Sequence, residues 1–257
     1  MKILFIGDVV GRCGVDAVFE NLPDLKEKYQ IDFCIANCEN SAGGFGVTRE
    51  VLEDLQRAGV DAFTGGNHIF SKREHLMVFD DMQFDIARPC NLSPESPGKG
   101  HVICNCKGIK IGIISLLGNL FMDCGVQNAF KSAEEEVRKV KGKADIIIID
   151  FHAEATSEKK AMGYFLDGKV SAVFGTHTHI QTADEEILPQ GTAYITDTGM
   201  CGAKNSVLGA KILPAVTRFL EGGKGHYEGA DGEKLFCGII ADIDESGKVT
   251  DILRVRQ

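Results

Sequence analysis

The chain has 257 residues, of which 44% are hydrophobic, so it is long enough to bury a sizeable core within one domain. It carries 28 basic and 37 acidic residues, a net charge of −9, and the lack of a basic stripe excludes a groove for long nucleic acid. No segment approaches the ~18 apolar residues of a membrane span, and the apolar run at the amino terminus is too short for a secretion signal. We therefore expect a soluble, cytoplasmic protein with a single domain over residues 1–257, and the sequence leaves homo-oligomer formation open.

Five segments have the composition of strands that are buried on both faces of a sheet. Each is a continuous run of β-branched and other apolar residues, which is typical of parallel sheets. In chain order these runs are Lys2–Gly7, Ile31–Cys38, Val60–Gly66, Asp145–Ile149 and Val170–Gly175.

Helices are predicted between these strands. Composition and pattern place them at residues 14–29, 48–58 and Ser157–Leu166. Pro23 falls inside the first of them and is a candidate interruption. Two Ser-x-x-Glu capping boxes, at Ser71 and Ser132, predict that further helices start there.

The second half of the chain changes character. Residues 85–100 are rich in Pro and Gly and read as a loop, and a hairpin follows with strands at His101–Cys106 and Ile109–Leu116. The last third has one predicted helix near 208–220. Its predicted antiparallel strands are Glu185–Leu188, Thr192–Thr196, Leu235–Asp242 and Val249–Val255. Strand–helix alternation followed by mostly β structure predicts an α/β (α+β) fold of two sheets packed face to face, with helices outside.

The nine cysteines indicate buried thiols rather than disulfides or a zinc site. Their number is odd, no Cys-x-x-Cys occurs, and most lie in or beside predicted strands. Reduced thiols of this kind are typical of a reducing cytosol. We expect His75, His101 and His226, which have no metal-binding neighbours in sequence, to be surface or local structural residues.

Metal-binding side chains follow the ends of the five apolar strands. The carboxyl ends of parallel strands form the crevice where ligands bind in such sheets. Imidazole combined with carboxylate and amide oxygens, without thiolate, suits divalent Mn, Fe or Zn rather than Ca or Mg alone. The pattern therefore predicts a site for two metal ions. The residues that supply it are Asp8, Glu39, Asn40, Asn67, His68, His152, His177 and His179.

Taken singly, several of these residues allow other interpretations. Asp8 could cap the helix that follows it, and His68 could merely bind a loop carbonyl. A lone His152 would be ambiguous. Glu39 is more informative, because a carboxylate directly after a buried strand rarely serves packing. Gly175–His179 carries the most weight, because alternate residues of an extended segment project the same way and both imidazoles would reach one cluster.

In order and spacing, these motifs resemble those of the calcineurin-like metallophosphoesterases. The chain departs from them at Val10, Glu39 and Ile69, where that family has His, Asp and Glu. With these departures, the motifs resemble YmdB-type proteins, which are bacterial 2′,3′-cyclic-nucleotide 2′-phosphodiesterases. The resemblance spans nearly the whole chain and is most specific in Asp150–Lys159 and Gly175–Glu185. It implies a four-layer α-β-β-α sandwich with two mixed sheets.

The resemblance also implies a role for each site residue. Asp8, Glu39, Asn40 and His179 would hold one metal ion, and Glu39 would bridge to a second ion held by Asn67, His152 and His177. The two divalent ions would be Fe or Mn, with Zn or Mg as alternatives. A metal-bridging hydroxide would attack the phosphorus, and His68, which is outside the ligand set, would protonate the leaving ribose oxygen as general acid.

The implied substrate is a small cyclic nucleotide, either 2′,3′-cyclic or 3′,5′-cyclic. Two alternatives stay open: a phosphomonoesterase or nucleotidase on the same scaffold, and a nucleotide-binding regulatory protein with little turnover. Arg88 is a candidate partner for the phosphate, although a surface salt bridge is an equal interpretation. The segment Thr198–Met200 is a candidate lining of the pocket.

Overall fold

The computed structural model describes residues 1–223 and 227–257, so the prediction for His226 lies outside the described residues. In chain order the elements are β1 (Lys2–Val9), α1 (Gly11–Tyr29), β2 (Phe33–Asn37), α2 (Arg49–Ala58), β3 (Ala62–Thr64), the 3₁₀ helix η1 (Arg73–Phe79), β4 (Ile86–Ala87), β5 (His101–Cys106), β6 (Ile109–Leu117), α3 (Ala129–Val140), β7 (Ile146–His152), α4 (Thr156–Leu166), β8 (Ala172–Thr176), β9 (Glu186–Ile187), β10 (Ala193–Ile195), β11 (Met200–Ala203), α5 (Ile212–Leu220), β12 (Lys234–Leu235), β13 (Cys237–Ile243) and β14 (Val249–Arg256). Within these residues no helix combines the length and the apolar character that crossing a membrane requires.

Two mixed sheets form the centre of the molecule. In the first sheet β1, β2, β3 and β4 are parallel neighbours, and β13 pairs antiparallel with β1 and with β14. At its carboxyl end β1 changes partner and pairs with β11 through Asp8 and Val9. In the second sheet the order is β5-β6-β7-β8-β10-β9, with β6, β7, β8 and β10 parallel.

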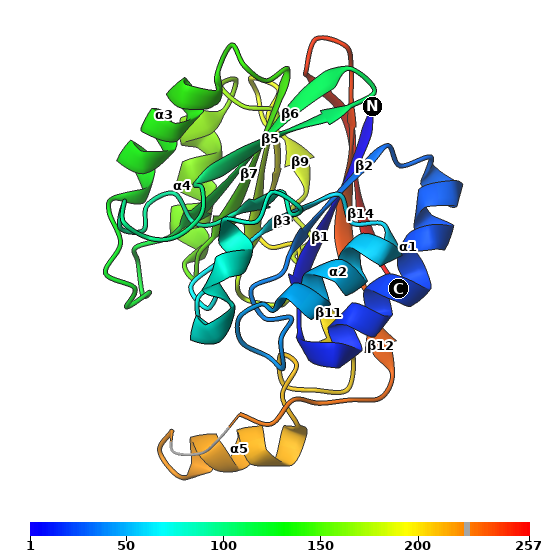
Figure 1. Ribbon diagram of the computed structural model, residues 1–257, viewed down its shortest axis with the longest axis vertical. Coiled ribbons are helices and arrows are strands. Elements are labelled where there is room, and N and C mark those ends of the chain that lie inside the picture. The colour runs from blue at the N-terminus through cyan, green and yellow to red at the C-terminus, as the bar shows by residue number, and fades with distance from the viewer. Residues whose placement is uncertain (224–226) are drawn as a thin grey trace.

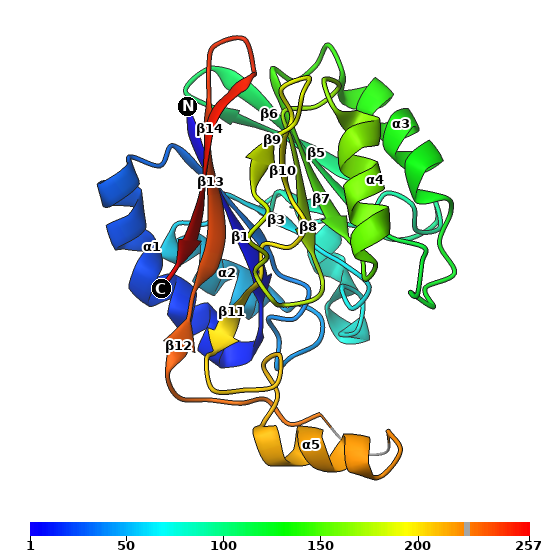
Figure 2. The same ribbon diagram turned by 180° about the vertical axis from the view of Figure 1, so that it is seen from behind.

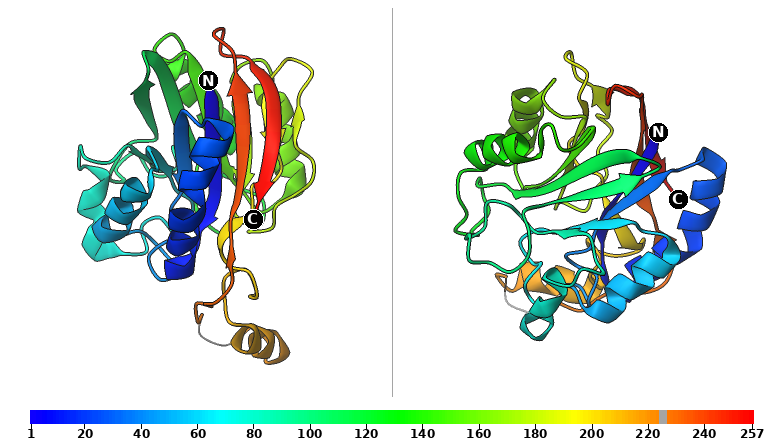
Figure 3. Two further views of the ribbon diagram at one scale, coloured as in Figure 1. Left: turned by 90° about the vertical axis from the view of Figure 1, so that its right-hand side faces the viewer. Right: turned by 45° about the horizontal axis from the view of Figure 1, so that its top comes forward.

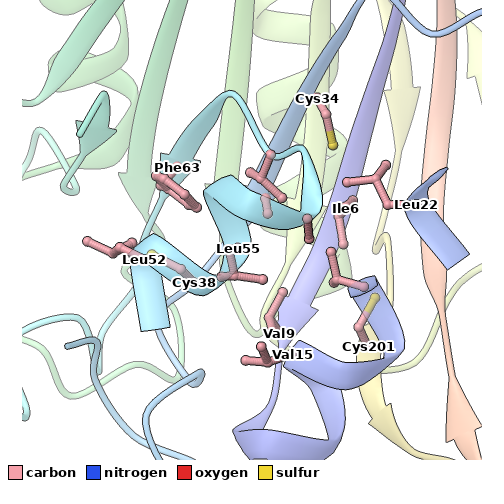
Figure 4. Close-up of a cluster of buried hydrophobic side chains, with 14 of the residues drawn as sticks. Ile6, Val9, Val15, Leu22, Cys34, Cys38, Leu52, Leu55, Phe63 and Cys201 are labelled. Atoms are coloured by element: carbon pink, nitrogen blue, oxygen red, sulfur yellow. The ribbon is translucent and has the colours of Figure 1, made fainter. Parts of the chain in front are cut away.

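Most of the buried apolar residues form three successive layers of packing, and Val10, Met200, Leu235 and Cys237 form a small separate cluster. One cluster, including Ile6, Leu22 and Leu55, lies between the first sheet and helices α1 and α2 (Figures 1 and 4). A second cluster, including Phe5 and Ile148, lies between the two sheets, and a third lies between the second sheet and helices α3 and α4. Figures 1 and 2 show the same arrangement, with α1 and α2 on one side of the paired sheets and α3 and α4 on the other. The predicted four-layer sandwich is confirmed.

The residues at the helix termini show which sequence signals for helix starts and ends were correct. Helix α2 begins after Thr48, whose side chain accepts a hydrogen bond from the Val51 N–H, and it ends at Gly59 with φ of 109°. Both Ser-x-x-Glu predictions are wrong. Helix α3 begins after Asn128, which caps it, so Ser132 lies inside the helix and is buried. After Ser71 the chain forms only a 3₁₀ helix, whose cap residue is Lys72 and has no side-chain hydrogen bond.

Other expectations are corrected in part. Pro23 lies within α1 without ending it. The last third is not wholly antiparallel, because β10 pairs parallel with β8 and antiparallel with β9. The predicted strand Leu235–Asp242 is divided at Phe236 into β12, which pairs with β11, and β13, which pairs with β1 and β14. Strand β11 was not predicted, since its sequence, Met200–Ala203, is too short to show a period.

All nine cysteines are free, as predicted. Cys34, Cys38 and Cys201 lie among the apolar side chains between the first sheet and its helices (Figure 4). Burial raises the pKa of the Cys34 and Cys38 thiols, which makes them poor nucleophiles and poor metal ligands. These thiols therefore act as small apolar side chains.

Helix α5 differs from the other helices because it stands away from the sheets. The left panel of Figure 3 and Figure 2 show it beyond the end of β12, at the tip of the segment between β11 and β12. None of its residues is buried, and Leu213, Phe219 and Leu220 are 75%, 78% and 81% exposed. We refer to residues 204–223 and 227–233 as the arm.

Candidate metal centre

The predicted ligands come from the carboxyl ends of parallel strands in both sheets. Asp8 is the penultimate residue of β1, and Glu39 and Asn40 follow β2. Asn67 follows β3, His152 ends β7, and His177 and His179 follow β8. A continuous set of contacts no longer than 3.8 Å joins all seven residues and His68.

The tightest part of this set surrounds the Nε2 atom of His152, which is completely buried. That nitrogen lies 3.1 Å from Glu39 Oε1, 3.0 Å from His177 Nδ1 and 2.9 Å from Asn67 Oδ1. One ligand atom from each of Glu39, His152 and His177 lies within 4.8 Å of the others. Four potential ligand atoms therefore converge on one point.

Asp8 is the centre of a second group of contacts within this set, which it makes with His152, His177 and His179. Its Oδ1 atom is buried and has no hydrogen-bond partner among the described residues, whereas Oδ2 accepts a hydrogen bond of 3.1 Å from the backbone N–H of His177. His152 Nδ1 and His179 Nε2 each lie 3.8 Å from Oδ1. A buried carboxylate oxygen without a partner is unfavourable unless a cation or a proton satisfies it. This orphan oxygen is the observation that best fits a metal ion.

The orientation of the neighbouring side chains partly suits that interpretation. The other ring nitrogen of His179, Nδ1, lies 3.1 Å from the Leu208 carbonyl, so an N–H there leaves the Nε2 lone pair facing Asp8. Asn40 turns its amide nitrogen toward Glu39 Oε1, at 3.0 Å, and toward His179 Nε2, at 3.2 Å. Its amide would have to flip for Oδ1 to bind a metal ion.

The sequence predicted the convergence of His177 and His179 for a wrong reason. The segment is not extended, because His177 has φ of 102° and His179 has φ of 64°. Left-handed backbone at these two residues, rather than the alternation of a strand, turns both rings toward the cluster.

A buried polar network lies behind His152 and joins the two sheets. Asp150 accepts hydrogen bonds from Asn37 Nδ2 and Thr64 Oγ1 of the first sheet, at 2.9 and 2.5 Å, and from Thr176 Oγ1 of the second, at 2.6 Å. Because the Thr176 hydroxyl donates to Asp150, its lone pair can accept from His152 Nδ1, 2.9 Å away. This arrangement presents the His152 Nε2 lone pair to the cluster. The sequence feature that could have indicated this network is the presence of polar residues such as Asn37 and Asp150 inside otherwise apolar strands.

Mutual charge and burial displace the pKa values of the cluster. Burial opposes ionisation of Glu39, but the charge and hydrogen bonding of His152 and His68 hold the Glu39 pKa at about 2. Burial likewise opposes protonation of His152, yet Glu39 and Asp8 raise the His152 pKa to about 9. Burial and then the charge of His152 lower the pKa of His177 to about 3, and burial raises the pKa of Asp8. Neighbouring positive charge thus favours the ionised form of Glu39, as a bound cation would.

A cavity of about 290 Å³ opens onto these residues. Its lining combines five of the predicted site residues, Glu39, Asn40, His68, His177 and His179, with the apolar or aromatic residues Val10, Phe45, Leu208 and Tyr227. No Lys or Arg lines the cavity in the described part of the chain. Its lining is Val10, Glu39, Asn40, Gly44, Phe45, His68, Glu154, His177, Thr178, His179, Leu208 and Tyr227.

Seven of these twelve lining residues were not predicted to belong to the site, namely Val10, Gly44, Phe45, Glu154, Thr178, Leu208 and Tyr227. Glu154 Oε2 lies 3.1 Å from His177 Nε2, and it is placed there because it follows β7 by two residues. Leu208 and Tyr227 belong to the arm, and the Tyr227 hydroxyl donates to the Gly209 carbonyl. Nothing in the sequence signalled that the arm folds back onto the strand ends.

Two candidate substrate contacts lie elsewhere. Arg88 is 7% exposed, donates to the Pro89 carbonyl at 2.8 Å and does not line the cavity. The segment Thr198–Met200 does not line it either. The Gly199 carbonyl instead accepts a bond from the Asp8 N–H, at 2.9 Å, and so holds the end of β1.

Known proteins are similar to this chain in sequence and in structure. The chain is similar to the 2′,3′-cyclic-nucleotide 2′-phosphodiesterase of Bacillus subtilis (strain 168), with 43% identity over 248 residues that cover 96% of this chain and 93% of that protein. A crystal structure described as a novel phosphatase, from Mycoplasma pneumoniae, matches with a TM-score of 0.93 and 37% identity over 100% of this chain and 93% of that one.

A more distant structure shares the fold alone. The 5′-nucleotidase precursor from Thermus thermophilus matches with a TM-score of 0.61 and 14% identity, over 100% of this chain and 54% of that one. The family described as YmdB-like protein matches residues 4–255, which is nearly the whole chain. Together with 43% identity to the Bacillus subtilis protein, this extent of similarity shows that the chain belongs to the YmdB-like family.

Proposed function

We propose that this chain is a two-metal phosphodiesterase that hydrolyses small cyclic nucleotides, with 2′,3′-cyclic nucleoside monophosphates as its main substrates. The buried, unpartnered Oδ1 of Asp8 among the converging ligand atoms of the described residues carries the proposal. The activity for which the Bacillus subtilis relative is named supports the choice of substrate class.

The residues present fit two divalent ions. Asp8, Glu39, Asn40 and His179 would hold one, and Glu39 would share the second with Asn67, His152 and His177, as the resemblance implied. When bound, such ions neutralise the charge of a phosphodiester and lower the pKa of a coordinated water. The mixture of imidazole, carboxylate and amide ligands favours Fe or Mn, with Zn or Mg as alternatives.

We assign His68 the role of general acid, and its contacts support this assignment. Its ring lines the cavity, packs edge-on against Phe45 with centroids 4.8 Å apart, and contacts Asn67 Nδ2 at 3.2 Å. Its backbone N–H donates to Glu39 Oε2 at 2.8 Å, which ties its position to the cluster. A proton on this ring would pass to the leaving ribose oxygen, which departs poorly as an alkoxide.

The mixed lining of the cavity suits both parts of the substrate. The polar lining residues would hold the phosphate, and Phe45, Leu208 and Tyr227 would contact the nucleoside. Without a lining Lys or Arg in the described residues, a dianionic monoester would lack the additional counter-charge that a phosphomonoesterase normally supplies. The cavity therefore favours a diester.

An assay of the protein reconstituted with Mn²⁺ tests the proposal. We expect turnover of 2′,3′-cyclic AMP and of bis(p-nitrophenyl) phosphate, slower turnover of 3′,5′-cyclic AMP and little release from p-nitrophenyl phosphate. Metal analysis of protein purified without chelators should give two ions per chain. Faster hydrolysis of the monoester than of every diester would favour a phosphatase, and bound metal without any turnover would favour a regulatory protein.

A further inference from the structure

The segment that carries His177 and His179 has an unfavourable backbone conformation. Both histidines lie in the left-handed region, with φ of 102° and 64°. Side chains other than Gly are seldom found there, and such residues persist only where the surrounding structure holds them. The neighbouring contacts should therefore contain a group that holds this segment.

That group is Asp197, which contacts the residue between the two histidines. Asp197 Oδ2 accepts hydrogen bonds from both the backbone N–H and the hydroxyl of Thr178, at 3.0 and 2.8 Å. Its other oxygen, Oδ1, accepts from the Gly199 N–H at 2.8 Å. Both oxygens are occupied by protein donors, so Asp197 is not available as a metal ligand.

Lys159 of helix α4 balances the charge of this carboxylate. Its Nζ donates to the same Oδ2 atom at 2.7 Å, and the side chains of Lys159 and Asp197 are 1% and 0% exposed. A fully buried ion pair of this kind contributes little net stability, because burying two charges offsets their attraction. Because Asp197 contacts Thr178 in the strained segment, a role other than net stability would explain why this buried pair is present.

We propose that Asp197, neutralised by Lys159, is a positioning residue for both metal sites. This inference rests on the proposed function, because it takes His177 and His179 as ligands of the two ions. By holding Thr178, Asp197 fixes the left-handed turns on either side of it. Those turns place His177 Nδ1 3.0 Å from His152 and His179 Nε2 3.8 Å from Asp8.

Asp184 offers a matched control. It is also a carboxylate at the edge of the same region, and it accepts bonds from Thr182 Oγ1 at 2.7 Å and from the Thr196 N–H at 3.1 Å. Its hydrogen bonds within the described residues go to Thr182 and Thr196, not to residues 177–179. Replacing it removes a comparable set of hydrogen bonds without touching the histidine segment.

Binding of Mn²⁺ to the chelator-treated protein, measured by isothermal titration calorimetry, tests the inference. We expect Asp197→Asn to weaken Mn²⁺ binding about 10- to 100-fold, the range typical of residues that orient metal ligands. Asp184→Asn should lower the melting temperature and leave Mn²⁺ affinity unchanged. Thr178→Val, which removes one donor and no charge, should weaken Mn²⁺ binding less than Asp197→Asn and serves if that variant fails to fold.

The double variant Lys159→Met with Asp197→Leu separates positioning from stability. It removes both buried charges, so it should recover much of the stability lost by Asp197→Asn while its Mn²⁺ affinity stays low. Mn²⁺ affinity equal to that of the unchanged protein, in this variant or in Thr178→Val, would overturn the inference.

A measurement on the metal-free protein keeps this inference distinct from the proposed function. We expect the ring NMR resonances of His177 and His179 to shift or broaden in Thr178→Val and to remain unchanged in Asp184→Asn. Unchanged resonances in Thr178→Val would overturn the positioning role. Failure of the unchanged protein to bind Mn²⁺ or hydrolyse a diester would instead count against the proposed function.

Discussion

His68 and His177 have different positions in the set of contacts, and their replacement by Ala should have different effects. His68 contacts the cluster through its backbone N–H and through Asn67, whereas a ring nitrogen of His177, Nδ1, lies directly against His152 Nε2 within the cluster. We expect His68→Ala to keep both metal ions and to lower turnover about 10²- to 10⁴-fold, the usual contribution of a general acid. His177→Ala should lose metal. Metal analysis of both variants, paired with the 2′,3′-cyclic AMP assay, checks this, and equal metal loss would contradict the two roles.

Gly66 is a second position where the addition of one atom, a Cβ, should disturb the candidate metal site. A Cβ there would overlap Glu39 Oε2 and His152 Nε2, so both side chains would have to move. We expect Gly66→Ala to weaken metal binding by about tenfold or more. Gly65→Ala is the control, because its Cβ would meet the apolar side chain of Ile69 instead. That variant should lose thermal stability while retaining metal, and a comparable loss of metal affinity from both would contradict the prediction.

At the scale of elements, a contact between His101 and Glu136 joins β5 to α3. Glu136 of α3 is 6% exposed and lies 2.6 Å from both His101 Nδ1 and Lys139 Nζ. Burial opposes its ionisation, but these two partners lower the Glu136 pKa below its ordinary value of 4.5. A lowered carboxylate pKa stabilises the fold above 4.5, and this contribution disappears as pH falls through the folded-state value.

Glu136→Gln tests this contribution. We expect the variant to be about 1 kcal/mol less stable than the unchanged protein at pH 7, with the difference diminishing below pH 4.5. Urea unfolding at several pH values between 7 and 3 measures it. A stability difference that stays constant across this range would show that the charge of Glu136 is not responsible.

At the scale of the whole molecule, the arm brings residues from the last third of the chain to the strand ends. Tyr227 packs against Phe45, with ring centroids 4.9 Å apart, and against Gly44, where a Cβ would overlap the tyrosine ring. His179 Nδ1 contacts the Leu208 carbonyl at 3.1 Å. The arm therefore forms one wall of the cavity although α5 itself stands clear of the sheets (Figure 2).

Removing the aromatic ring of this wall should affect substrate binding rather than chemistry. We expect Tyr227→Leu to raise KM for 2′,3′-cyclic AMP about tenfold, in line with the loss of one base–aromatic contact, with a smaller change in kcat. Tyr227→Phe, which loses only the hydroxyl bond to Gly209, should change KM little. Methyl ribofuranoside 2′,3′-cyclic phosphate, which lacks a base, should show no rise in KM with Tyr227→Leu. An equal rise for both substrates would mean that the ring does not contact the base.

Local sequence patterns were sufficient for most of the strands and for the convergence of the candidate ligands. Apolar runs identify buried strands because both faces of each sheet are covered, and parallel strands end at a common edge, so residues such as Asp8 and His152 had to lie near one another. Helix starts were less predictable. The Ser-x-x-Glu pattern at Ser132 occurs inside α3, because the buried face of that helix extends back to Ala129 and Asn128 was available as the cap.

The tertiary structure alone decided what surrounds the cluster. Asp197 and Thr178 are 19 residues apart, and the Asp150 network joins Thr64 to a residue 86 positions later, so no local pattern signals either contact. No local pattern signals the left-handed backbone at His177 and His179 either, and the arm reaches the cavity through Tyr227, far from any motif. The amino-acid sequence by itself determined which chemical groups meet, because strand periodicity acts over a few residues. Their orientation and the shape of the cavity followed only from packing between segments that are distant in the chain.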